Sequence, residues 1–151
     1  MDKHLHRLVY CSRNRIQGSD AEIQAELESI LASARKNNSV LEITGALLYN
    51  LGNFAQVLEG PLPAIERIFE VIQRDPRHSE VTVVYSGAAP ARDFPEWSMA
   101  FIGSRDQQDV PLAAAAFHSV FSNEEGAGEQ MLGALKDLVV SEDEWILSDA
   151  A

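Results

Sequence analysis

The chain has 151 residues and a mass of 16.6 kDa, which corresponds to one ordinary domain and excludes a second independent one. Hydrophobic residues make up 46% of the chain and charged residues 23%, a globular composition that excludes a disordered or fibrous protein. The net charge of −11 repels DNA and anionic membranes, so neither nucleic acid nor a membrane is expected as a direct partner.

The first half of the chain predicts a strand, a helix and a hairpin. β-branched and aromatic residues are typical of a strand, while Ser19 and Asp20 are natural N-caps for the helical spacing of apolar residues that follows. Gly52 lies in a short turn between two further apolar runs, as in a hairpin. The predicted elements are strands over residues 5–12, 43–50 and 54–59, and a helix that ends at Asn37 and Asn38.

The second half predicts a helix, two strands and two more helices. Pro61 and Pro63 stand where a first helical turn tolerates proline, and the apolar stripe after them ends before Pro76. The remaining predicted elements are strands over residues 80–86 and 97–102 and helices over residues 111–121 and 129–140.

This order of elements predicts an α+β fold, the ferredoxin-like βαββαβ pattern with one extra strand. Right-handed crossovers place the first two helices on one face of the sheet. Strands 43–50 and 80–86 are almost continuously apolar, which predicts that both faces are covered, and we assign the two C-terminal helices to the second face. The charge is also uneven, since residues 104–151 carry −8. We therefore expect a domain over residues 1–103 and a helical extension over residues 104–151.

Cysteine content and hydropathy indicate a cytoplasmic protein. Cys11 is the only cysteine, so no internal disulfide can form. No apolar run approaches the ~18 residues of a membrane span, and the first 30 residues lack the apolar stretch of a signal peptide. His4 and His6 alternate as metal ligands would, but no third ligand stands at a useful spacing, and we expect no metal site.

Polar residues at apolar strand positions are the candidates for function. The period of two puts Gln56 on the same face as two apolar neighbours, and an unpaired buried amide costs roughly 1–3 kcal/mol. Tyr10 poses the same question in the first strand, and Asn37 and Asn38 place amides at the end of the first helix. Each also has an ordinary structural explanation, which for Asn38 is a helix C-cap.

Five segments in the same order and spacing resemble the BLUF family, the sensors of blue light using FAD. The segments are LVYCSRN (8–14), NN with ITGALLYN (37–50), FAQVLEG (54–60), RDPRHS (74–79) and FPEWSMAF (94–101). The resemblance covers about residues 5–103, and the tail looks like the helical extension of short BLUF proteins. It implies FAD bound between the first two helices over the sheet.

The resemblance also implies roles for individual residues. Tyr10 matches the photoactive tyrosine and Gln56 the switch glutamine, whose amide carries an acceptor at one end and donors at the other. Asn38 matches the asparagine at the carbonyl edge of the flavin ring, and Asn37 a neighbouring position that varies. Trp97 and Met99 match a photoactive pair, of which either could lie next to Gln56. Further cofactor contacts are implied for Arg77 and His78 at the ribityl–phosphate end and for Ile43 against the ring.

The implied function is a blue-light photoreceptor rather than an enzyme. Electron and proton transfer from Tyr10 and a rearrangement of Gln56 would switch the hydrogen bonds and signal to a partner protein, and a homo-oligomer is expected. One alternative is a small acylphosphatase-like hydrolase, with Arg13 or Arg15 and Asn38 at a phosphate, although no glycine-rich cradle follows the first strand. The other is a flavin-free dimerisation module. Both alternatives predict a colourless protein.

Overall fold

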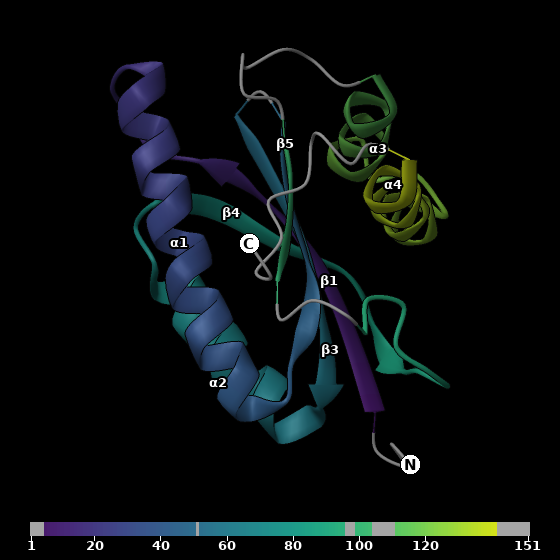
Figure 1. The fold of residues 1–151 in the computed structure, drawn as a ribbon. Coiled ribbons are helices and arrows are strands. Elements are labelled where there is room, and N and C mark those ends of the chain that lie inside the picture. Colours follow the sequence, from purple (N-terminus) through teal and green to yellow (C-terminus); the bar gives the residue numbers. More distant parts are fainter. Residues whose placement is uncertain (1–4, 51, 96–98, 104–110, 142–151) are drawn as a thin grey trace.

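The computed structural model of the chain describes residues 5–50, 52–95, 99–103 and 111–141. Within these residues the strands and helices alternate much as the sequence predicts (Figure 1). In chain order they are β1 (Leu5–Asn14), α1 (Asp20–Leu41), β2 (Thr44–Asn50), β3 (Asn53–Pro61), α2 (Leu62–Arg74), β4 (His78–Ala88), β5 (Ala100–Gly103), α3 (Pro111–Phe121) and α4 (Ala127–Ser141).

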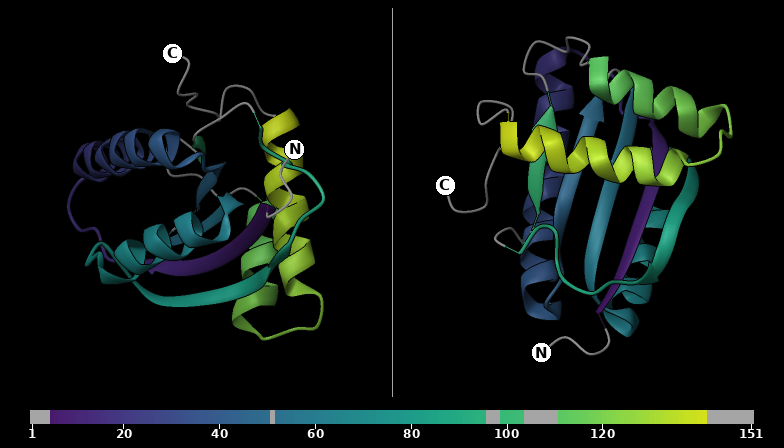
Figure 2. Two further views of the ribbon diagram at one scale, coloured as in Figure 1. Left: turned by 90° about the horizontal axis from the view of Figure 1, so that it is seen from below. Right: turned by 90° about the vertical axis from the view of Figure 1, so that its right-hand side faces the viewer.

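The strands form one sheet with the order β4-β1-β3-β2-β5. β1 runs antiparallel to both β3 and β4, β2 runs antiparallel to β3, and β5 is added parallel to β2. Figure 1 shows α1 and α2 on one face of this sheet and α3 and α4 on the other. In the right-hand view of Figure 2, α3 and α4 run across the strands that they cover. The predicted ferredoxin-like βαββαβ fold with C-terminal helices on the second face is confirmed.

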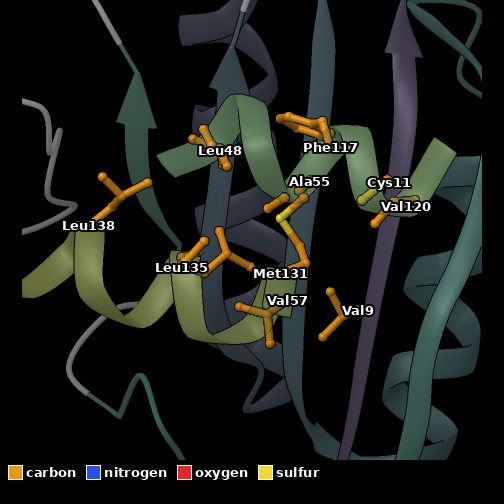
Figure 3. Close-up of a cluster of buried hydrophobic side chains, with 14 of the residues drawn as sticks. Val9, Cys11, Leu48, Ala55, Val57, Phe117, Val120, Met131, Leu135 and Leu138 are labelled. Atoms are coloured by element: carbon orange, nitrogen blue, oxygen red, sulfur yellow. The ribbon is translucent and has the colours of Figure 1, made fainter. Parts of the chain in front are cut away.

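Alternation along the strands divides the interior into two cores. On one side Leu8 and Tyr10 of β1 and Leu58 of β3 pack against α1 and α2. On the other side lie Val9 and Cys11 together with residues of β2, β3, α3 and α4. Figure 3 shows this second core, where strand residues meet side chains of the two C-terminal helices: Leu48, Ala55, Val57, Phe117, Val120, Met131, Leu135 and Leu138.

β4 is less buried than its sequence predicts. β2 and β3 are buried along almost their whole length, whereas β4 alternates between half-buried and exposed residues, and Val83 is 45% exposed. Both faces of β4 make contacts, Val81 with the core under α1 and α2 and Val84 with the core under α3 and α4. The coverage is less complete than predicted, since β4 lies at the edge of the sheet and pairs only with β1. α4 nevertheless begins directly on it: a Cβ added to Gly128 would lie 2.2 Å from the carbonyl oxygen of Val84.

α1 is longer than predicted, and this changes the position of Asn38. Ser19 is the N-cap, as expected, and forms a reciprocal capping box with Glu22. The helix continues to Leu41 because Glu42, in the left-handed conformation with φ 61°, caps it through its own N–H. Asn38 is therefore an internal helical residue with a buried side chain, and its interpretation as a C-cap was wrong.

A buried cluster of charges fastens the connection that follows β4. Glu59 is fully buried, and its carboxylate accepts hydrogen bonds from Arg7 Nη2 (2.9 Å) and from the backbone N–H groups of Asp93 (2.8 Å) and Phe94 (2.9 Å). Arg92 donates to the carbonyl oxygen of Glu59 at 2.9 Å. Residues 92–94 are thus held against the end of β3.

None of the helices in the described part of the chain is long and apolar enough to cross a membrane.

Candidate functional site

A pocket opens between α1, α2 and the sheet. The space inside it that the centre of a water molecule can reach measures about 130 Å³. Residues Ile30, Ala34 and Asn38, four apart on α1, line one wall because that spacing keeps them on one helical face. The other lining residues are Tyr10, Ser33, Asn37, Leu47, Phe54, Gln56, Ile68, Val71, Ile72, Asp75, Arg77 and His78. The walls are mostly apolar, with polar groups at the floor and the mouth.

At the floor of the pocket, three side chains from three strands or strand ends form a chain of hydrogen bonds. Tyr10 and Gln56 are direct partners in the antiparallel register of β1 and β3. The phenol of Tyr10 donates to Gln56 Oε1 at 2.5 Å, and Gln56 Nε2 donates to Met99 Sδ at 3.4 Å. All three residues are buried. The Gln56 amide therefore uses its acceptor toward β1 and one of its donors toward the start of β5.

Burial decides the protonation of Tyr10. Removal from water raises the pKa of the phenol far above its ordinary value of 10.0, and Cys11 and Asp75 add smaller contributions in the same direction. The ring packs against Phe69, with centroids 5.6 Å apart, and meets His78 edge-on at 6.1 Å. Tyr10 is consequently a neutral, well-packed hydrogen-bond donor.

The two asparagines of α1 differ sharply in exposure. Asn38 is 1% exposed, while Asn37 lies exposed at the mouth of the pocket. Asn38 takes part in a further interaction, yet its buried side-chain oxygen Oδ1 has no hydrogen-bond donor among the described residues. A ligand with an N–H group at this edge would satisfy that oxygen.

His78 joins β1 to the end of α2 beside Tyr10. Its Nε2 lies 2.6 Å from the carbonyl oxygen of Ile72, and its Nδ1 lies 2.7 Å from Ser12 Oγ. A carbonyl can only accept, so Nε2 carries a proton, and a neutral ring accepts from Ser12 at Nδ1. His78 thus lies near the floor of the pocket. Among the described residues, no three histidine, cysteine or acidic side chains are placed to hold a metal ion.

Arg77 lies at the mouth of the pocket, where a more open groove begins that Arg74 and Glu26 also line. Its guanidinium group pairs with Asp75 at 2.7 Å and approaches Glu26 at 3.4 Å. The hydrogen bond between Arg77 and Asp75 lowers the pKa of the carboxyl group and raises that of the guanidinium, so both stay charged at neutral pH.

The remaining sequence candidates fall into three different places. Met99 lies against Gln56, as one of the two implied arrangements requires. Ile43 is buried in the neighbouring core and does not line the pocket. Trp97 lies outside the described residues. Sequence reasoning missed Phe54, although it shares the strand face of Gln56, and missed Arg35, whose bond to Met99 joins positions 64 residues apart.

The pocket fits an isoalloxazine ring. Such a ring is flat and apolar over most of its surface and carries carbonyl and N–H groups along one edge, which matches apolar walls that end at polar side chains. The buried Oδ1 of Asn38, for which the described residues supply no donor, is a suitable acceptor for that edge. Tyr10 and Gln56 offer neutral hydrogen-bonding groups at the floor.

Comparisons with known proteins agree with this geometry. The family profile described as "BLUF: Sensors of blue-light using FAD" matches residues 5–100. The chain is 32% identical over 113 residues to the "Blue light- and temperature-regulated antirepressor BluF" of Escherichia coli (strain K12), covering 75% of this chain and 27% of that protein. It is 36% identical over 99 residues to "Photoactivated adenylate cyclase subunit beta" of Euglena longa, covering 65% of this chain and 11% of that protein. The chain thus spans only about a tenth to a quarter of the length of these relatives.

Solved structures of shorter proteins match almost from end to end. "BlrB - a BLUF protein, dark state structure" superposes with a TM-score of 0.70 and 32% identity, covering 92% of this chain and 97% of the other. "BlsA photo-activated state" superposes with a TM-score of 0.72 and 26% identity, covering 91% and 96%. Both matches extend beyond the family profile and include the C-terminal helices. The chain belongs to the BLUF family of blue-light sensors that use FAD.

Proposed function

We propose that Tyr10 and Gln56 carry the light response of this sensor and that a partner protein receives it. The observation that supports this most directly is the chain from Tyr10 through Gln56 to Met99 at the floor of the pocket. A glutamine between two groups of different kinds can exist in two arrangements, because reversing its amide exchanges the acceptor for the donors.

When bound, FAD would supply the absorption of blue light and the one-electron chemistry. The apolar walls would hold the ring by burial, and Asn38 Oδ1 would accept a hydrogen bond at its polar edge. Arg77 lies at the mouth of the pocket and also lines the open groove, where the ribityl–phosphate end of the cofactor would lie. Asn37 is exposed, and it would contact the cofactor at the rim of the pocket.

Tyr10 is suited to give up an electron and a proton together. Its phenolic proton already lies on a hydrogen bond to Gln56 Oε1, so loss of an electron sends that proton along the bond. When the electron and the proton have returned to Tyr10, Tyr10 has its original composition, and only the arrangement of the Gln56 amide differs. The rearranged amide no longer offers the same donor to Met99 Sδ, which passes the change to the start of β5.

We further propose a two-part organisation, with residues 1–103 as the sensing domain and residues 104–151 as the output extension. α3 and α4 pack on the face of β3 opposite Gln56. Their connecting turn and the start of α4 present the exposed carboxylates of Glu124, Glu125 and Glu129, which suit a partner with a basic surface. We expect that a homo-oligomer of this chain passes the signal to a partner protein in the cytoplasm.

Absorption spectroscopy of the purified protein tests these roles. The wild type should be yellow, and blue light should shift its flavin band reversibly to the red. Tyr10→Phe and Gln56→Leu should bind flavin and lose the normal shift, because the first lacks the phenolic proton and the second lacks the reversible amide. Tyr85→Phe removes a hydroxyl on the opposite side of the sheet and should respond normally. A normal response of the first two variants would refute the assigned roles.

A further inference from the structure

Arg35 connects the helix that carries Asn38 to the residue that contacts Gln56. It lies one turn before Asn38 on α1 and is half-buried. Its Nε donates a hydrogen bond of 2.9 Å to the carbonyl oxygen of Met99. The bond therefore ties α1 to the chain just ahead of β5.

The bond from Arg35 bears directly on the position of Met99. β5 has four residues and, in the described part of the chain, pairs with β2 alone, beginning at Ala100 opposite Ala46. Ala100 is the first paired residue of this ladder, and the bond from Arg35 holds the carbonyl group of Met99 just before it. Its side chain must nevertheless place Sδ within 3.4 Å of Gln56 Nε2, and a thioether sulfur is a weak acceptor whose bond depends on position.

We propose that Arg35 is a positioning residue that holds Met99 against Gln56 and thereby sets the lifetime of the light-induced arrangement. The inference rests on the proposed role of Gln56. With Arg35 in place, Met99 Sδ remains where the donor end of the dark Gln56 amide can reach it. Without Arg35, that contact loosens, and the hydrogen bond that draws Gln56 back to its dark arrangement weakens.

The rest of the connection should survive the loss of Arg35. Glu59 holds the backbone of Asp93 and Phe94 independently, and Phe94 is itself buried in the core beneath α3 and α4. α1 keeps its own buried contacts through Leu27 and Leu31. We therefore expect a substitution at Arg35 to change the position of Met99 while these core contacts remain.

The test is the rate of dark recovery after a blue-light pulse, followed by flavin absorbance. Arg35→Ala should slow recovery roughly 2- to 10-fold, the rate change that corresponds to one modest hydrogen bond. Arg35→Lys should restore most of the rate, since its ammonium group can still donate to the Met99 carbonyl. Lys36→Ala is the matched control, because Lys36 is the next residue on α1 and is exposed. It should recover at the wild-type rate.

A double-mutant cycle separates positioning from a general effect on the fold. In a Met99→Leu background, Arg35→Ala should change the recovery rate no further, because the sulfur that Arg35 positions is gone. An unchanged rate in Arg35→Ala, or an equal slowing in both backgrounds, would overturn the inference. If Arg35→Ala fails to retain flavin, Arg35→Gln, which keeps a shorter donor, replaces it in the same cycle.

The same measurements distinguish this inference from the proposed function. A wild type without a red shift, or a Tyr10→Phe variant with a normal one, would refute the function itself. A normal wild type and an unresponsive Tyr10→Phe, combined with an unaffected Arg35→Ala, would refute only the role of Arg35.

Discussion

At the scale of single residues, the site consists of buried polar atoms whose donors and acceptors are matched to named partners. Tyr10 can only donate in its neutral form, and Gln56 accepts with its oxygen and donates with its nitrogen. His78 is placed by Ser12 and Ile72 on either side of its ring. Because the groups of Tyr10 and Gln56 are buried and His78 is half-buried, a lost partner leaves an unsatisfied group and carries a measurable cost.

The two asparagines of α1 offer a matched comparison of flavin affinity. Asn38→Ala should weaken flavin binding roughly 2- to 10-fold, since one hydrogen bond to a buried edge is worth about 0.5–1.5 kcal/mol. Asn37→Ala should change affinity less, because Asn37 is exposed at the rim. Titration of the apoprotein with FAD measures both. Equal affinities of Asn38→Ala and the wild type would show that Asn38 serves the helix rather than the cofactor.

The buried thiol of Cys11 should make the folded protein less stable at alkaline pH. Burial raises the pKa of its thiol from 9.0 to about 12. Between these values the unfolded chain loses the thiol proton and the folded chain keeps it, so this group lowers the free energy of unfolding by about 1.4 kcal/mol per pH unit as pH rises. Its contribution is fully present below pH 9. The buried phenol of Tyr10, whose pKa is also raised, adds to the fall above pH 10.

Urea unfolding between pH 7 and pH 11 tests this expectation. Cys11→Ala should be less stable than the wild type at pH 7, because it leaves a cavity in the core. Its stability should nevertheless fall less steeply above pH 9. Parallel pH profiles for the two proteins would show that Cys11 does not titrate differently on folding.

At the scale of secondary-structure elements, β3 links the two sides of the molecule. Gln56 faces the pocket, while Glu59, three residues later, faces the other side and holds the connection between β4 and β5. Arg7 of the neighbouring strand β1 completes this buried cluster and also pairs with Asp93 at 2.9 Å. Glu59 therefore joins β3 directly to the segment at residues 93–94.

Glu59 should be among the most important charged residues for stability. Glu59→Ala leaves two backbone N–H groups without their acceptor and removes the fully buried carboxylate that pairs with the guanidinium of Arg7, so we expect a loss of about 3–5 kcal/mol. Glu70→Ala removes an exposed partner of Arg74 on α2 and should cost less than about 1 kcal/mol. Equilibrium unfolding in urea compares the two variants. Similar small losses for both would contradict the role given to the buried cluster.

At the scale of the whole molecule, the sheet is the shared wall between the sensing pocket and the C-terminal helices. Met131 and Leu135 of α4 pack in the core that includes Ala55 and Val57, the neighbours of Gln56 in β3 (Figure 3). Two polar contacts extend the connection at the edges: Lys136 lies 3.6 Å from Asp93, and Arg13 lies over the ring of Phe121 at 4.1 Å. The helices are thus in contact with the strand that carries the switch.

Hydrogen exchange in the dark and under continuous blue light should reveal this connection. Light need only shift an existing equilibrium, by no more than the energy difference between the two arrangements of Gln56. Protection should change in residues 89–95 and 127–138, whereas residues 22–31 of α1 should exchange at the same rate in both conditions. Gln56→Leu is the control and should show no light-dependent difference. Identical exchange of α4 in light and dark would show that this helix only covers the sheet and takes no part in the response.

Local patterns in the sequence were enough to predict the order of elements, from which the fold class follows, and the neighbours that share a strand face with Tyr10 and Gln56. Both predictions depend on short-range geometry, since the period of two in a strand and the helical spacing of apolar residues are properties of neighbouring positions. The resemblance to the BLUF family was likewise carried by short segments in register, and the family profile confirmed it.

Which of these residues meet depends on pairings between segments that are far apart in the chain. The apolar run of β4 did not reveal an edge strand, because strand order depends on pairings between distant segments. α1 extends beyond its predicted end at Asn38, because Glu42 caps it in a left-handed conformation. The contact of Met99 with Gln56 spans 43 residues and the pair of Arg7 with Glu59 spans 52, so no local pattern contains either one. The site is built from such non-local contacts, which exist only once the chain has folded.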